Sequence, residues 1–296
     1  MKTYRIFGQF ITKSPLSHIS ESISTTSYLV QEPILQENGE IEEVFCYNGN
    51  AWRGQLRDLA ASYLLDKLGI KVSVDGFHLL FSGGKIGGDQ TIDINQAKNM
   101  RRAIPMFSVF GGGVGNQIIA GKLKVGSSYP VCLEAIPALS ERWLNEAAKL
   151  SYRDMTTEKS FTRFDDSKNF DKQEYVNPLD LPMLEGGKKK KDDVSTQMRM
   201  TSELLIVGVK LVHEIDLVQV SDIELGAFIS ALHRFAHTPY IGGQSNRGHG
   251  RVDYRSVIVD SDGNQQDLIK ITGDMPKLSS FAQDKKQAYD DYLVEQ

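Results

Sequence analysis

The sequence has few cysteines and no long apolar run. Its 296 residues include two cysteines, Cys46 and Cys132, whose spacing matches neither a disulfide scaffold nor a metal site. No apolar stretch has the length of a membrane span or the position of a secretory signal. We therefore expect no membrane partner and, by default, a cytoplasmic protein.

The sequence also lacks an excess of positive charge. It has 34 Lys and Arg against 38 Asp and Glu, a net charge of −4. A nucleic-acid partner would therefore have to be held by a local basic surface. Apolar residues make up 40% of the chain, which is ordinary for a globular protein, and the length suffices for a substantial core.

Periodicity predicts the main elements. Residues 2–12 alternate as a strand, and helical spacing over 48–69 ends at Gly69. A second helix begins with a capping box at Ser221 and Glu224. Further strands are expected at 70–84, with a turn at Asp75-Gly76, and around Lys122 to Lys124. A short helix is expected after Ser140. Another strand is expected over 202–217, where Leu205, Val207, Val209, Leu211 and Ile215 share a face, and the last strand is expected at 252–260.

This order is close to a split β-α-β-β-α-β plan with both helices on one face of an antiparallel sheet. It predicts an α+β fold: one RRM-like or ferredoxin-like palm domain over 1–296 with large insertions. Residues 13–48 have little periodicity and are expected to form an inserted functional loop. A polar insertion is expected at about 151–200, with a loop tip at Lys188–Lys191, and a possible helical tail at 273–296.

A glycine-rich segment, "TPYIGGQSNRGHGRVDYR" (238–255), follows the second helix. It is no P-loop, because a helix precedes it, a strand follows it, and it has no Lys-Ser/Thr pair. Its glycines permit close backbone approach, and Arg247 and Arg251 are available for phosphates. A tight turn with solvated arginines explains the same residues more simply.

The other candidate binding or catalytic residues also have simple structural explanations. Arg53 and Arg57 lie four residues apart near a helix start, where they could hold phosphate or be solvated. His18 follows the first strand, where a general base would be well placed, but it has no partner at a fixed spacing. His233 and His237 have i,i+4 spacing without a third ligand, so no metal site is expected.

Four motifs together resemble a known family. They are "ITKSPLSHIS" after the first strand, "NGNAWRGQLRDL" at the helix start, "FGGG" before a strand, and "IGGQSNRGHGRV" after the second helix. The chain is similar over most of its length to the RAMP superfamily of CRISPR RNA-binding subunits, in its Cas-seven-like backbone branch. "NAWRGQLRDLAASYLLDKLG" looks most like the type IV CRISPR version, the Csf-two type.

The resemblance implies a backbone subunit whose copies form a helical filament along a guide RNA (crRNA), with a thumb hairpin at about 151–200. It implies sequence-independent contacts to phosphates and sugars. The residues expected to contact RNA are Arg53, Arg57, Arg247 and Arg251, with Lys13, Ser17, His18, Asn50, Lys122, Lys124, Gly242, Gly243, Gln244, Ser245 and Asn246. Implied partners are the guide, a target nucleic acid (expected to be DNA), and other type IV subunits: a Cas-five-like cap, a large subunit, a guide-processing enzyme and sometimes a helicase. No cofactor is implied.

The sequence departs from the family's target-RNA-cleaving members at one point. Those members carry an aspartate between the first strand and first helix, whereas residues 19–47 contain no Asp, only the glutamates Glu21, Glu32, Glu37, Glu40, Glu42 and Glu43. We therefore expect a non-catalytic scaffold. The alternatives are a RAMP-type endoribonuclease using His18 or a loop glutamate, and a target-RNA-cleaving backbone subunit.

Overall fold

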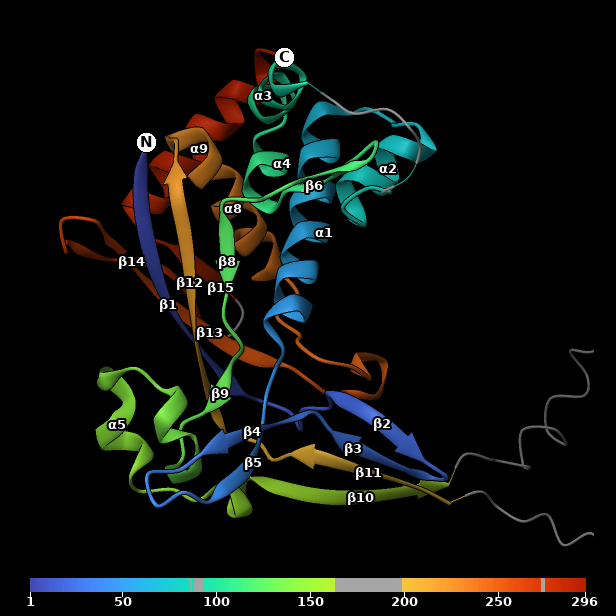
Figure 1. The fold of residues 1–296 in the computed structure, drawn as a ribbon, viewed down its shortest axis with the longest axis vertical. Helices are drawn as coiled ribbons and strands as arrows, with labels where there is room; N and C mark the ends of the chain where they lie inside the picture. The colour runs from blue at the N-terminus through green and yellow to red at the C-terminus, as the bar shows by residue number, and fades with distance from the viewer. Residues whose placement is uncertain (86, 88–92, 163–198, 273–274) are drawn as a thin grey trace, which may run out of the picture.

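A computed structural model describes residues 1–296 except 86, 88–92, 163–198 and 273–274. Its largest layer is a 7-stranded antiparallel sheet in the order β15-β14-β13-β1-β12-β8, with β9 also paired to β12 (Figure 1). The strands are β1 (Lys2–Thr12), β8 (Leu123–Val125), β9 (Tyr129–Pro130), β12 (Lys210–Val220), β13 (Val252–Asp260), β14 (Gln265–Thr272) and β15 (Met275–Leu278).

The predicted α+β fold class is confirmed. Four adjacent strands, β13-β1-β12-β8, are the fourth, first, third and second strands of the β-α-β-β-α-β plan. Helix α1 (Gly49–Leu68) and helix α8 (Asp222–Phe235) occupy its two helical connections and lie on one side of the sheet (Figure 1). The C-terminal helix α9 (Ser280–Val294) packs beside α8, so the segment expected as a tail contributes Tyr289 and Leu293 to the core.

Local chemistry explains why these elements begin and end where they do. Alternation in β1 buries Tyr4, Ile6, Gly8 and Phe10, as predicted. The side chain of Asn48 caps α1, and Gly69 ends it in the left-handed conformation with φ 63°. The capping box of Ser221 and Glu224 opens α8 as predicted.

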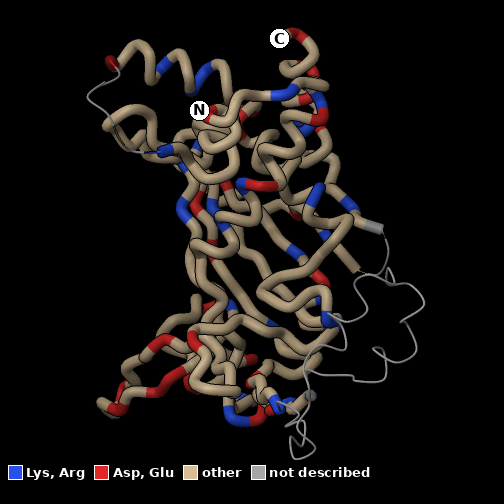
Figure 2. The backbone as a smooth tube through the Cα atoms, turned by 90° about the vertical axis from the view of Figure 1, so that its right-hand side faces the viewer, with Lys and Arg blue, Asp and Glu red and all other residues tan. Residues whose placement is uncertain are grey.

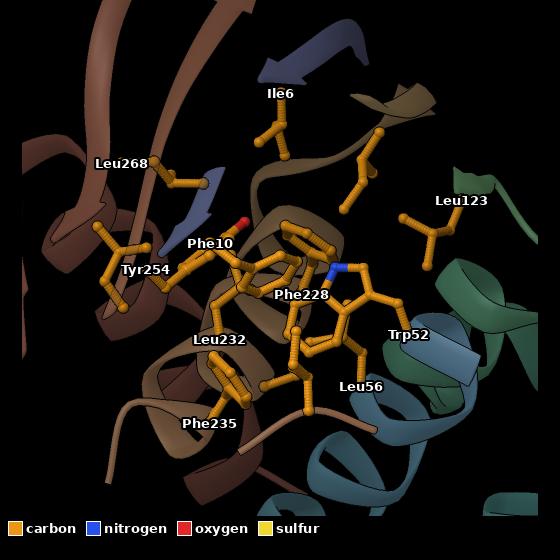
Figure 3. Close-up of a cluster of buried hydrophobic side chains, with 14 of the residues drawn as sticks. Ile6, Phe10, Trp52, Leu56, Leu123, Phe228, Leu232, Phe235, Tyr254 and Leu268 are labelled. Atoms are coloured by element: carbon orange, nitrogen blue, oxygen red, sulfur yellow. The ribbon is translucent and has the colours of Figure 1, made fainter. Parts of the chain in front are cut away.

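Aromatic side chains join the helices to the sheet. Trp52 of α1 lies edge-on to Phe10 of β1 at 5.3 Å and to Phe235 of α8 at 4.8 Å between ring centroids. Tyr254 of β13 lies 4.8 Å from Phe10 on its other side (Figure 3). Such pairs each add about 0.5–1.5 kcal/mol beyond their area burial, so this cluster fixes α1 against the sheet.

Several predictions for the middle of the chain were wrong. Residues 70–84 contain helix α2 (Val74–Phe81) instead of a strand, because the Ser73 side chain caps the Gly76 N–H. A second capping box, at Asp93 and Gln96, opens α3 (Ile94–Ala103), a helix that the sequence analysis did not predict. Helix α4 (Pro105–Phe110) and the hairpin of β6 (Gly112–Val114) and β7 (Gln117–Ile119) follow.

Residues 13–48 are not an irregular loop. They form β2 (Ile19–Ile23), β3 (Thr26–Leu29), β4 (Gln31–Leu35) and β5 (Ile41–Phe45). Strands β2 and β3 join β10 (Thr156–Thr162) and β11 (Arg199–Leu205) in a second sheet, while β4 and β5 form a hairpin. The segment expected as a thumb thus begins and ends in the paired strands β10 and β11; its residues 163–198, including Lys188–Lys191, lie outside the described residues.

Two further details differ from the prediction. Val207 is 52% exposed, because the chain turns at Ile206 to Gly208 between β11 and β12. The sheet continues beyond 252–260 with β14 and β15.

The remaining short elements include one that was predicted. Helix α5 (Glu141–Ala147) follows Ser140 as predicted, and short 3₁₀ segments lie at Leu133–Ala138, Tyr152–Met155 and Ser245–Arg247. No described helix is both long and apolar enough to cross a bilayer.

A buried histidine interrupts the apolar core. His213 of β12 lies opposite Gly8, where a Cβ atom would stand 2.2 Å from its Nε2. The ring stacks on Phe10 at 5.1 Å, and neither ring nitrogen has a hydrogen-bond partner among the described residues. Burial lowers the pKa of His213 from 6.5 to about 3, so the folded protein holds it neutral.

This histidine makes stability depend on pH. The unfolded chain binds a proton at His213 below pH 6.5 and the folded chain does not, so the free energy of unfolding falls as the pH drops from 6.5 towards 3. The contribution of this residue approaches ~1.4 kcal/mol per pH unit. In urea unfolding at pH 7, 6 and 5, His213→Gln should give a flatter profile than the wild type. Equal slopes for the wild type and the variant would contradict the assignment.

Candidate nucleic-acid interface

Two segments from opposite ends of the chain meet at the end of β1. The N–H of Gly243 donates to the carbonyl of Ser17 at 2.6 Å, and that of Gly250 donates to the carbonyl of Pro15 at 2.9 Å. The N–H of Lys13 donates to the carbonyl of Arg251 at 2.7 Å. The turn at 13–18 and the glycine segment at 240–251, hereafter the glycine loop, therefore form one backbone layer.

The start of α1 lies against the same layer. The amide of Gln55 donates to the carbonyl of Tyr240 at 2.7 Å and accepts from the Tyr47 hydroxyl at 3.3 Å. The backbone of Gly242 lies beside the same Tyr47 hydroxyl. The three sequence motifs singled out above, at 13–18, at the helix start and at 240–251, thus lie side by side.

The glycines of the loop serve contacts within the protein. Gly242 has φ 73°, and a Cβ atom there would lie 2.3 Å from the carbonyl oxygen of Ser17. Gly250 has φ 84°, and its Cβ would lie 2.1 Å from the carbonyl oxygen of Ile241. The sequence interpretation assigned this space to an approaching ligand, but at these two positions the neighbouring backbone fills it.

Exposed polar groups cover the outer side of this layer. Arg247 stands 4.7 Å from the ring centroid of Phe161 in β10, and Lys13 lies 3.6 Å from the carboxylate of Asp253. Arg251 is exposed as well. The remaining exposed candidates are Asn50, Gly242, Gly243, Ser245 and Asn246, with Gln244 half-buried in the left-handed conformation at φ 59°.

The positive field here includes a residue that the sequence did not indicate. Burial lowers the pKa of His249 first, and the charges of Lys159 and Arg247 lower it further. Lys159 belongs to β10, so the second sheet adds a cation beside the glycine loop. Strongly acidic segments lie at the lower left in Figure 2, at one end of the molecule.

Arg57 is a correction to the predicted site. It is 8% exposed, and its guanidinium donates to the carbonyls of Gly111 at 3.0 Å and Phe110 at 2.7 Å, at the end of α4. Arg53 donates to the same Phe110 carbonyl at 2.5 Å. Burial lowers the pKa of Arg57, and the Arg53 charge adds to this. Both cations satisfy carbonyls at the end of α4 and hold this helix in place. Arg57 is buried in this role and does not reach the surface, whereas Arg53 is half-buried.

Lys122 is likewise internal. Its ammonium is 2.7 Å from both carboxylate oxygens of Glu224, and its side chain is 15% exposed. Glu224 also accepts from Ser108 and caps α8, and these hydrogen bonds lower its pKa although burial opposes them. Lys124 is exposed, but on β8 opposite Asp216, towards the other end of β1 from the glycine loop.

His18 and Ser17 have structural contacts. The Nε2 of His18 accepts from the N–H of Asn48 at 3.5 Å, and its ring lies edge-on to Tyr47 at 5.0 Å. Burial lowers the pKa of His18, so the ring is neutral. Ser17 is fully buried, and its hydroxyl has no partner among the described residues. The described part of the chain contains no group of three or more His, Cys, Asp or Glu that could hold a metal.

Comparisons with known proteins find a match among solved structures but not among family models or curated proteins. No family model matches the sequence, and no curated protein matches it. A chain of the structure named "Type IV-B CRISPR Complex" matches with a TM-score of 0.60, covering 85% of this chain and 90% of that chain at 20% identity. The two chains share a fold. The resemblance drawn from the sequence motifs is therefore confirmed at the level of the fold.

Sequence reasoning missed Tyr47, Gln55 and Lys159. Gln55 lies between the two arginines in "WRGQLR", and its polar side chain nearly two turns into the helix was the available signal. Lys159 carries no signal, because its position depends on pairing between β10 and β11.

The buried Arg57 and the exposed Arg247 should differ in their effect on the free energy of unfolding. Arg57→Ala leaves the end of α4 with fewer donors and should lower the free energy of unfolding by about 2–3 kcal/mol. Arg247→Ala, at an exposed position, should change it by less than about 0.5 kcal/mol. Chemical denaturation of both variants checks this, and a neutral Arg57→Ala would contradict the internal role.

Proposed function

We propose that this chain is the guide-RNA-binding backbone subunit of a type IV CRISPR effector. It polymerises along the guide and presents it for pairing with a target nucleic acid, with DNA as the expected target. The observation that carries the proposal is the fold shared over 85% of the chain with a chain of a type IV-B CRISPR complex. The filament of copies, the Cas-five-like cap, the large subunit, the guide-processing enzyme and a helicase are part of this proposal.

The surface at the end of β1 has the chemistry that such a role requires. Lys13, Arg247 and Arg251 are exposed beside a polar rim with Asn50 and Ser245. Cations of this kind hold phosphates whatever the base sequence, as guide binding demands. Arg57, Arg53 and Lys122 support this surface from inside, because they fix the helices behind it.

We also propose that the subunit is a non-catalytic scaffold. The Nε2 of His18 faces the backbone N–H of Asn48 at 3.5 Å, and its ring packs edge-on to Tyr47, which favours a structural role over that of a general base. Among the glutamates of 19–47, Glu32 accepts from Cys46 at 3.1 Å and also bonds the Tyr129 hydroxyl. These groups hold the β4–β5 hairpin in place.

The protein should co-purify with RNA of discrete length as a multi-copy complex. Arg247→Glu combined with Arg251→Glu should reduce the retained RNA and lower the slope of log affinity against log salt by about 1.4, since about 0.7 is lost per single-strand phosphate contact. Lys71→Glu, at an exposed position beyond the far end of α1, is the matched control and should retain wild-type RNA.

Two results would overturn the proposal. The first is a monomer free of nucleic acid whose behaviour does not change with salt. The second comes from incubating the complex with labelled guide and target RNA: cleavage that disappears in His18→Ala or Glu32→Gln would favour the endoribonuclease alternative.

A further inference from the structure

The face of the main sheet turned away from α1 and α8 carries a row of cations. The strand register pairs Gln9 with Arg255, Arg255 with Lys270, and Lys270 with Lys277. Directly opposed residues share one face of a sheet, so Arg255, Lys270 and Lys277 lie side by side across β13, β14 and β15. These three residues are hereafter the cationic row.

Folding alone does not account for this row. Like charges directly opposite each other destabilise a sheet. Arg255 has Asp267 at 3.3 Å, but Lys270 and Lys277 have no carboxylate within ion-pair distance in the described part of the chain. A lysine on an edge strand discourages unwanted strand pairing, which explains Lys277 on β15 but not Lys270 on the inner strand β14.

A cavity of about 250 Å³ adjoins the row. It is lined by two aromatic residues, two arginines and two amides, with two further residues of β13: Phe7, Trp143, Arg142, Arg255, Gln9, Gln265, Ser256 and Val257. The guanidinium of Arg142 lies 3.8 Å from the ring centroid of Phe7 and donates to the Gln265 amide oxygen at 3.1 Å. Aromatic faces, planar cations and amides are the groups on which single-stranded bases stack and with which they form hydrogen bonds.

We propose that this face binds a single-stranded nucleic acid, with phosphates along the cationic row and one base in the cavity beside Phe7. Neighbouring strands lie about 4.8 Å apart, so the row spans about 10 Å, the length of two or three nucleotides. On the opposite flank Arg5 is bound to Asp216 at 2.9 Å and lies 4.0 Å from Glu214. These carboxylates repel a polyanion and direct the strand towards β15.

This surface differs from the guide surface proposed above and does not depend on it. The glycine loop lies beyond the Thr12 end of β1, whereas the row crosses β13 to β15. A subunit with both surfaces can hold a guide on one and a second single strand on the other.

The test uses the full-length protein, with whatever RNA it retains, and fluorescein-labelled (dT)20 and U20 in anisotropy titrations at 50 mM salt. Lys270→Glu combined with Lys277→Glu should weaken binding by about tenfold or more. Phe7→Leu keeps an apolar side chain but removes the ring against which the Arg142 guanidinium lies, and it should weaken binding about threefold or more because Arg142 is no longer held as a stacking platform. Lys71→Glu should bind as the wild type does, and thermal melting confirms that each variant is folded. The two probes show whether the site prefers DNA or RNA.

Each of the following results would contradict a specific part of the proposal. Unchanged binding of both oligonucleotides to the double lysine variant overturns the proposal, as does a loss of subunit association without any loss of oligonucleotide binding. Loss of the co-purified RNA in that variant places the row on the guide path and overturns the second-strand assignment. Unchanged binding by Phe7→Leu overturns the base cavity. Arg247→Glu with Arg251→Glu should affect retained RNA alone, so the two proposals can fail separately.

Discussion

The close approach of the glycine loop to residues 15–18 is the contact on which the candidate surface depends. The Ser17 carbonyl accepts from Gly243 and stands where a Cβ of Gly242 would be. This contact joins the end of β1 to the segment between α8 and β13, and Gln55 ties both to α1. Any side chain at Gly242 would separate the layers, so the exposed cations on them would lose their relative positions.

Buried polar contacts behind this layer hold the helices that support it. Arg53 and Arg57 close the end of α4, and Glu224 links the start of α8 to Lys122. Lys122 and Glu224 form an ion pair, whereas the two arginines donate to backbone carbonyls, because a buried charge without any partner would cost several kcal/mol. The protein thus uses part of its basic content to build the scaffold, and a smaller set of cations remains exposed at the proposed guide surface.

The sequence predicted the palm better than the site. The alternation of β1 and the capping box at Ser221 are local signals, and both elements formed as expected. The helix at 74–81 was mistaken for a strand, because short apolar runs fit either state. Among the strands between 13 and 48, β2 has no buried residue and therefore no alternation to detect, and the other three are only four or five residues long. Arg57 was misassigned because its acceptors lie about fifty residues away in the chain, where periodicity gives no information.

Crosslinking of the native complex tests the central claim most directly. Ultraviolet irradiation of the protein with its co-purified RNA, followed by mass spectrometry of the peptides, maps where the backbone of the RNA lies. We expect crosslinks in peptides containing residues 13–18, the start of α1 and 240–251. Crosslinks confined to other parts of the chain, or the absence of bound RNA, would contradict the assignment of this surface as the guide-binding site.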